Sequence, residues 1–367
     1  MRIRRIGMLT GGGDAPGLNP ALKAIVYRAI AHDVEVMGLP DGWHGLLDAG
    51  IGEAIRLEDY QVRRWDRDGG TNLGSSRTNP FHVTLPGEAG AYDRSDEVMA
   101  NIARLGLDAV IALGGEDTLG VAHRLSEKGC QVVGIPKTID KDLSHTDYTL
   151  GFDTALRNCT SVIEQARTPA GSHHWVQVVE VMGRYAGHLA LWSAVAGGAT
   201  LVLIPEYPFA YERVYELLAR RLARGRQDRR YPRYAVIVAA EGAHADEEGV
   251  VTLDASRDAF GHERLGGIGS QLAQRIRRDT PFDSRELVIG HSQRGGSPSA
   301  LDRIMGRMFG SAAVEAVRRG DWGQMVSAQG IGPTCQLRMV PLSQAVSGLN
   351  TVDLECVYDT DRYTAKV

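Results

Sequence analysis

Cysteine and long apolar segments are both scarce in this chain of 367 residues. The four cysteines lie far apart and show no metal-ligand spacing, so we expect free thiols in a reducing compartment and neither a disulfide framework nor a zinc site. No apolar run approaches the ~18–20 residues of a membrane span, and the N-terminus lacks the apolar segment of a signal peptide. These absences predict a cytoplasmic protein without a membrane partner.

A large excess of charge of either sign is also absent. The chain has 41 basic and 45 acidic side chains, a net charge of −4, which argues against binding to nucleic acid or to an anionic membrane surface. The hydrophobic share of 43% and the charged share of 23% are ordinary for a soluble globular protein. At roughly 150 residues per domain, this length predicts about two domains.

Glycine, in contrast, is abundant, and the 44 glycines predict many tight turns between strands and helices. Short apolar runs that read as buried strands alternate with amphipathic helical patterns along most of the chain. This alternation predicts an α/β fold with parallel sheets and helices on both faces. The predicted strands are 4–10, 34–39, 108–113, 130–135, 175–181, 200–204, 234–239 and 287–289.

Two loops in the first part of the chain are rich in glycine, and the first of them follows a predicted strand. The first, Gly11–Gly17, runs into a helix predicted from Asn19 to about Ala31, and free backbone N–H groups at such a helix start can bind an anion. It matches neither the dinucleotide fingerprint nor a Walker loop, and a purely structural turn is the alternative. The second, Gly69–Arg77, delivers one arginine and favours either a phosphate site or a solvated loop.

A third loop, Pro136–Asp142, follows the strand 130–135 and carries a lysine and two aspartates. In open α/β sheets, ligands bind just beyond the carboxyl ends of the strands. Asp140 and Asp142 could therefore divide two tasks, accepting a proton and holding a cation, while Lys137 could neutralise an anion. A polar connecting loop without function is the other interpretation.

The predicted strand ends carry many charged and small residues together. Several cations, several carboxylates and several glycine-rich loops suit phosphoryl transfer, which needs positioning, charge neutralisation and one proton acceptor. Hydride transfer would not need so many cations. The residues are Gly13, Arg77, Glu116, Lys137, Asp140, Asp142, Arg184, Glu241, His291 and Arg294.

Four blocks in order, Leu9–Gly17, Gly114–Thr118, Pro136–Asp142 and Val179–Arg184, together resemble the phosphofructokinase family, with Gly290–Gly296 as support. The resemblance covers residues 1–320. It implies two doubly wound, Rossmann-like parallel-sheet domains with the active site in the cleft between them. Residues 1–151 and about 293–343 would bind the phosphate donor, and about 152–292 and 344–367 the sugar phosphate.

The resemblance also implies a phosphotransferase that acts on the 1-hydroxyl of fructose 6-phosphate and requires Mg²⁺. Asp140 matches the family's general base, Arg184 the arginine on the transferred group, and Thr138 lies in the same loop. Glu116 and Asp142 match the positions that serve Mg²⁺. Gly13 and Arg77 match the donor site. The positions that match sugar-phosphate contacts are Thr138, Met182, Gly183, Arg184, Glu241, Arg285, His291 and Arg294, with Arg285 reaching across from a neighbouring subunit of a homodimer or homotetramer.

Two further positions bear on the donor. Family members that use ATP usually carry glycine at the positions of Asp117 and often of Lys137, whereas members that use pyrophosphate resemble this chain. A carboxylate at position 117 would repel the α-phosphate of a nucleotide, and Lys137 would add charge against a short anionic donor. We therefore expect pyrophosphate as the donor, in a reaction that runs in both directions, with ATP as the alternative.

Three residues depart from the family pattern. Trp175 stands where many members have an arginine that grips the 6-phosphate, Tyr27 replaces an arginine of the effector site, and Lys141 replaces the usual asparagine between the two aspartates. Other classes are less well supported. A kinase of another substrate would not explain the loop with Asp140 and Asp142, a non-enzymatic sugar-phosphate sensor would not keep both carboxylates, and a dehydrogenase would need a ribose-binding acid.

Overall fold

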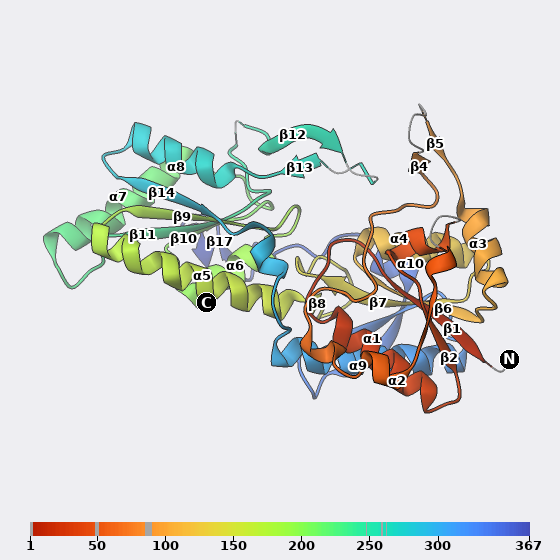
Figure 1. Cartoon of the computed structure of the whole chain (residues 1–367). Coiled ribbons are helices and arrows are strands. Elements are labelled where there is room, and N and C mark those ends of the chain that lie inside the picture. The colour runs from red at the N-terminus through yellow and green to blue at the C-terminus, as the bar shows by residue number, and fades with distance from the viewer. Residues whose placement is uncertain (1–2, 48–50, 85–89, 247, 258–259, 262) are drawn as a thin grey trace.

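The computed structural model describes residues 3–47, 51–84, 90–246, 248–257, 260–261 and 263–367. It consists of two α/β lobes that lie side by side (Figure 1). Strands from residues 5–151 and 324–341 build the first sheet, and strands from residues 176–288 build the second. The chain therefore crosses between the lobes more than once.

The first sheet has the strand order β16-β15-β7-β6-β1-β2-β3, with β8 paired to β7. Its central strands are parallel, while the edge strands β3 and β16 run antiparallel to their neighbours. The sequence predicts only parallel strands here, so these two edges are a difference from expectation. The bounds are β1 Arg5–Thr10, β2 Glu35–Gly38, β3 Ile55–Leu57, β6 Ala109–Gly114, β7 Val132–Thr138, β8 Leu150–Gly151, β15 Gln324–Gln329 and β16 Gln336–Pro341.

Helices cover both faces of the first sheet. On one face α1 (Leu18–Ile30) packs on α9 (Ala300–Arg319) over a core that contains Ile25 and Phe309. On the other face α3 (Ser95–Arg104), α4 (Glu116–Glu127) and α10 (Leu342–Ala345) enclose a second core around Trp43. Burial on both faces explains why the central strands are almost continuously apolar.

The second sheet is parallel throughout, with the order β10-β11-β9-β14. Figure 1 shows the long helix α5 on one side of this sheet and α8 on the other. A single core of mostly Val, Ile, Leu and Ala side chains fills this lobe. The bounds are β9 Val176–Val181, β10 Leu201–Leu203, β11 Ala235–Ala240, β14 Ser284–Val288, α5 Phe152–His173, α6 His188–Gly197, α7 Tyr211–Gln227 and α8 Ile268–Asp279.

Short elements complete the described part of the chain. They form three two-stranded pairs, a short α-helix and four 3₁₀ turns. The bounds are β4 Val83–Thr84, β5 Ala91–Tyr92, β12 Thr252–Arg257, β13 Glu263–Leu265, β17 Tyr358–Asp359, β18 Thr364–Ala365, α2 Asp59–Val62, η1 Gly42–Leu46, η2 Ile51–Glu53, η3 Trp65–Arg67 and η4 Gly290–Arg294.

The predicted strands are confirmed, with ends that differ by at most three residues. Three differences from the predicted elements are notable. Strand β7 continues to Thr138, so Lys137 and Thr138 belong to the strand and not to the loop after it. Helix α7 continues to Gln227 and includes Arg224 and Arg226, although the basic residues from Arg224 to Arg233 favour a solvated loop after a helix that ends near Ala223. The sequence predicts no element for residues 300–319, where α9 lies.

Helix α9 is hard to predict because it contains Gly306 and Gly310, which lower helix propensity. Both glycines face α1 at very short range. A Cβ on Gly306 would lie 2.8 Å from the carbonyl oxygen of Gly17, and one on Gly310 would lie 2.4 Å from that of Ala21. The two helices can therefore approach closely, and this tertiary contact outweighs the weak local preference.

Within the described residues, no helix combines the length and the apolar character that a membrane crossing requires.

Candidate active site

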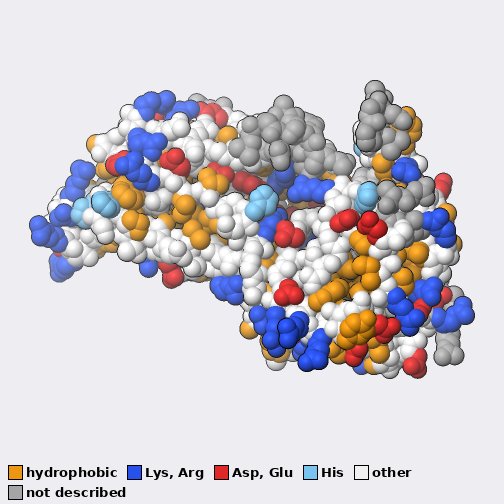
Figure 2. Space-filling model, viewed as in Figure 1, with side chains coloured by type: hydrophobic (Ala, Val, Ile, Leu, Met, Phe, Trp, Pro, Cys, Tyr) orange, Lys and Arg blue, Asp and Glu red, His pale blue; other side chains and the backbone are white. Residues whose placement is uncertain are grey.

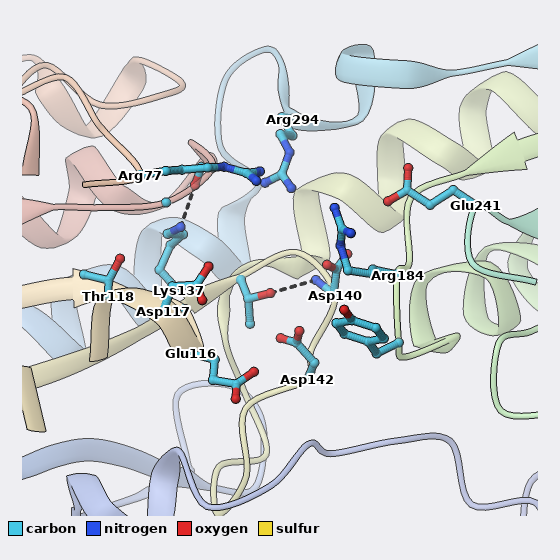
Figure 3. A pocket seen from close by; sticks show the side chains of 15 residues that line it. Arg77, Glu116, Asp117, Thr118, Lys137, Asp140, Asp142, Arg184, Glu241 and Arg294 are labelled. Atoms are coloured by element: carbon cyan, nitrogen blue, oxygen red, sulfur yellow. Dashed lines mark hydrogen bonds between the residues drawn. The ribbon is translucent and has the colours of Figure 1, made fainter. Parts of the chain in front are cut away.

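A cavity of about 140 Å³ lies between the lobes, at the carboxyl ends of strands from both sheets. Figure 2 shows basic and acidic side chains gathered along the indentation between the lobes. Most of the residues that the sequence points to line this cavity, and Figure 3 shows many of their side chains converging. They are Gly13, Arg77, Glu116, Asp117, Lys137, Thr138, Asp140, Asp142, Arg184, Glu241 and Arg294.

The glycine-rich loop after β1 forms one wall of the cavity. Arg294, from the 3₁₀ turn η4, donates a hydrogen bond of 2.9 Å from Nη1 to the carbonyl oxygen of Asp14. Its guanidinium covers Gly13 so closely that a Cβ there would lie 2.8 Å from Nη1. Glycine at position 13 thus lets a cation lie directly against the loop. This arrangement suits an anion held by backbone N–H groups and a guanidinium.

Lys137 lies beneath the same loop. It is only 3% exposed, and its Nζ donates a hydrogen bond of 2.5 Å to the carbonyl oxygen of Gly13 (Figure 3). Burial, and then repulsion from Arg294, lowers the pKa of Lys137 to about 7. A bound polyanion would favour the charged form of this lysine.

The Asp140 loop leaves β7 at the cavity floor. Thr138 Oγ1 accepts a hydrogen bond of 3.1 Å from the backbone N–H of Asp140 and so fixes the start of the loop. Lys141, between the two aspartates, has a left-handed backbone with φ of 56°. Such a conformation is unfavourable for lysine and marks a constrained turn.

The charged groups around Asp140 act on its pKa in opposite directions. Burial and the neighbouring Asp142 carboxylate raise the pKa of Asp140 to about 6, although Arg294, Arg184 and Lys137 all act to lower it. Burial also raises the pKa of Asp142, against a hydrogen bond from Thr138. A carboxylate with such a pKa can accept a proton near neutral pH.

The second sheet contributes Arg184 and Glu241. Arg184 follows β9, and Glu241 directly follows β11. In Figure 3, Arg184 points toward Asp140, and Glu241 lies on the side opposite Lys137. Burial, then the charge of Asp140, raises the pKa of Glu241 to about 7. Both lobes are therefore needed to complete the cavity.

Four predicted residues lie outside this cavity. Met182 and Gly183 precede Arg184, and the backbone N–H of Met182 donates to Gln293 Oε1 at 3.0 Å. His291 lines a neighbouring cavity that shares Gly12, Gly13 and Arg77 with the first. Arg285 lies on the outer surface near the start of β14, with its side chain 54% exposed. Its guanidinium lies 5.6 Å from the ring centre of Trp175.

Several residues at the cavity have no predicted role. Thr118 and Tyr185 line it. Thr118 ends one of the sequence blocks that carry the resemblance, and Tyr185 directly follows another. Gly12 and Gly115 line it as well. Gln293 does not line the cavity, but its Oε1 accepts hydrogen bonds from both the Met182 backbone and Cys159 and so links the end of β9 to α5 beside the cavity. Adjacency to predicted residues could have indicated both, since Tyr185 follows Arg184 and Gln293 precedes Arg294.

The carboxylates of the cavity bear on whether it can hold a divalent cation. Oδ1 of Asp140 and Oδ1 of Asp142 are buried and accept no hydrogen bond from the described residues. Among those residues, no three His, Cys, Asp or Glu side chains form a metal-binding group. Mg²⁺ commonly uses only one or two carboxylates and takes its other ligands from substrate phosphates and water. The pair Glu116 and Asp142 fits that mode of binding.

Comparison with known proteins decides the family. The family model described as phosphofructokinase matches residues 5–317. The chain belongs to the phosphofructokinase family. This match confirms the resemblance that the sequence blocks indicate.

Individual members of the family differ in the donor that they are named for. The chain is 46% identical to the pyrophosphate–fructose 6-phosphate 1-phosphotransferase of Amycolatopsis methanolica, over 96% of this chain and 97% of that protein. It is 41% identical to the ATP-dependent 6-phosphofructokinase 3 of Streptomyces coelicolor, over 96% and 99%. The phosphofructokinase of Pichia pastoris in the T-state superposes with a TM-score of 0.77 at 28% identity, and the chain spans 95% of its own length but 38% of that chain.

Proposed function

We propose that this phosphofructokinase transfers a phosphoryl group from pyrophosphate to the 1-hydroxyl of fructose 6-phosphate, giving fructose 1,6-bisphosphate and phosphate in a reversible reaction. The observation that carries the donor assignment is the pair Asp117 and Lys137 at one cavity wall. The relatives named for pyrophosphate, at 44–46% identity, support it.

The donor argument rests on charge and space. Asp117 lies in the first turn of α4 and Lys137 at the end of β7, next to the glycine-rich loop. Pyrophosphate ends at its second phosphorus, so it needs no room beyond the loop and gains from the buried ammonium. A nucleotide would bring its α-phosphate and nucleoside toward the Asp117 carboxylate, which repels it.

Asp140 is the proposed general base. Its raised pKa, its buried Oδ1 and its place between the lobes suit a carboxylate that takes the proton of the 1-hydroxyl as the phosphoryl group arrives. Thr138 and the backbone of the loop orient it. Glu241, on the facing lobe, would bind sugar hydroxyl groups.

The cations are the proposed stabilisers of charge. Arg184 would hold the transferred group, while Arg77, Lys137 and the N–H groups around Gly13 would hold the phosphate that leaves. Glu116 and Asp142 would hold Mg²⁺, which when bound supplies further neutralisation of the phosphate oxygens. Each group acts by position and charge, which is the main requirement of phosphoryl transfer.

Assembly and compartment complete the proposal. We propose a cytoplasmic homodimer or homotetramer in which Arg285 reaches the sugar phosphate of a neighbouring subunit. Its place on the outer surface of its own lobe, away from its own cavity, supports such a role.

The second candidate is the same reaction with ATP, and the identity of 41–42% to relatives named ATP-dependent favours it. Parallel initial-rate assays with purified protein, fructose 6-phosphate, Mg²⁺ and equal concentrations of each donor separate the two. We expect turnover with pyrophosphate and at least ~10²-fold lower kcat/KM with ATP. Efficient use of ATP without use of pyrophosphate would refute the donor assignment.

A further inference from the structure

The C-terminal strap, defined here as residues 349–352, joins the Asp140 loop to the start of α6, the helix that follows Arg184. Figure 1 shows the last part of the chain passing from the first lobe to the second. At its start, Leu349 forms an isolated antiparallel bridge with Leu143, just after the Asp140 loop. At its end, Val352 is buried in the core of the second lobe.

Asn350 binds the Asp140 loop at two successive carbonyl groups. Its side-chain Nδ2 donates a hydrogen bond of 2.8 Å to the carbonyl oxygen of Lys141. Its backbone N–H donates another of 2.8 Å to that of Asp142. The residue thereby grips the loop where Lys141 has its left-handed φ of 56°. Because Lys141 separates Asp140 from Asp142, its backbone angle sets how the two carboxylates point relative to one another.

The same strap also binds the start of α6, four residues after Arg184. The carbonyl oxygen of Asn350 accepts a hydrogen bond of 3.1 Å from Nε2 of His188, the first residue of α6. Because a carbonyl can only accept, the proton of this imidazole must lie on Nε2. The backbone N–H of Val352 donates to Glu206 Oε1 at 2.8 Å, and this carboxylate also accepts the N–H of Gly187 at 2.8 Å.

We propose that Asn350 is a positioning residue, which holds the strained Lys141 turn and so fixes the general base relative to Arg184 on the other lobe. The proposal deepens the proposed function and rests on it. Asparagine adopts the left-handed conformation more readily than lysine. With lysine at position 141, the left-handed turn therefore depends more on the hydrogen bonds from Asn350 than it would with asparagine.

The test compares Asn350→Ala, Lys141→Asn and the double variant with wild type. Thr351→Ala, an exposed neighbour in the strap, is the matched control. We expect Asn350→Ala to lower kcat about 10-fold to 10²-fold, since small misplacements of reacting groups cost rates of this order. KM for fructose 6-phosphate should change less than about threefold, because sugar-binding groups keep their places. Thr351→Ala should match wild type.

The double variant separates positioning from a general loss of stability. Lys141→Asn should restore most of the kcat lost in Asn350→Ala, because the turn then forms with less help from position 350. An equal loss in the single and the double variant would overturn the proposal, and so would an Asn350→Ala enzyme within twofold of wild type. If Asn350→Ala does not fold, Asn350→Asp removes the same Nδ2 donor while it keeps both backbone bonds.

Failure of the proposed function would look different. Assays of the wild-type enzyme test which donor is used. The role of Asn350 is tested by the ratio of kcat in the variant to kcat in wild type, measured with whichever donor supports turnover. If neither donor supports turnover, crystal structures of wild type and Asn350→Ala test this role. The proposal predicts that Lys141 leaves the left-handed region in the variant, and an unchanged loop would contradict it.

Discussion

Lys137 offers a direct test of how the donor site works. With a pKa lowered to about 7, its ammonium is charged in only about one tenth of the molecules at pH 8. A donor phosphate beside the buried Nζ restores the charge, so binding should take up about 0.9 proton at this pH. The donor's own titration also contributes protons, but that contribution is the same for a variant such as Lys137→Met.

The affinity that this lysine supplies can be worked out for a donor phosphate in contact with its ammonium group. A unit charge 4 Å from the ammonium gains about 4 kcal/mol at an effective dielectric constant of about 20. Protonating the lysine one pH unit above its pKa costs about 1.4 kcal/mol. The difference of about 2.6 kcal/mol predicts that Lys137→Met binds pyrophosphate about 80-fold more weakly at pH 8.

Titration calorimetry in Tris and in HEPES measures both quantities, because the two buffers differ in ionisation enthalpy. We expect wild type to take up about 0.9 proton more than Lys137→Met on binding Mg²⁺-pyrophosphate. Lys128→Met, at a surface lysine paired with Asp96, is the control and should behave as wild type. Equal proton uptake in wild type and Lys137→Met would refute the assigned role of the buried ammonium.

Three other changes have defined outcomes. Asp140→Asn should lower kcat by at least ~10² with KM for the sugar nearly unchanged, since it removes only the proton acceptor; unaltered turnover would exclude Asp140 as the base. The same variant should become more stable than wild type in scanning calorimetry, by a margin that grows as pH rises from about 4 to about 6. The reason is that the raised pKa of Asp140 makes its charged form costly in folded wild type. A margin already present in full at pH 4 would contradict this cause. For wild type, kcat/KM should fall below pH about 6 as Asp140 becomes protonated, and an acid limb that persists unchanged in Asp140→Asn would assign it to another group. Asp117→Gly should raise kcat/KM with ATP at least ~10-fold while pyrophosphate use stays or falls, and an unchanged donor preference would contradict the charge argument.

Much of the site could be predicted because it follows from the order of strands. Residues such as Glu116, Asp140 and Arg184 come within a few residues after apolar runs, and the carboxyl ends of parallel strands share one edge of a sheet. Local pattern therefore places them together even without knowledge of the tertiary contacts.

The parts that the sequence could not indicate depend on contacts between distant segments. Asn350 lies 209 residues from Lys141, and an isolated asparagine in a polar segment has no local pattern that points to a loop elsewhere. Helix α9 depends on close packing of Gly306 and Gly310 against α1, a contact that opposes their low helix propensity. The depth at which Lys137 is buried likewise depends on Gly13 and Arg294, from two other segments.

The reverse reaction tests the central claim most directly, since it supplies no nucleotide at all. Wild-type protein is incubated with fructose 1,6-bisphosphate, inorganic phosphate and Mg²⁺, and the products are followed by ³¹P NMR. The proposal predicts that pyrophosphate and fructose 6-phosphate accumulate together in equal amounts. No pyrophosphate in this mixture, together with formation of ATP once ADP is added, would contradict it.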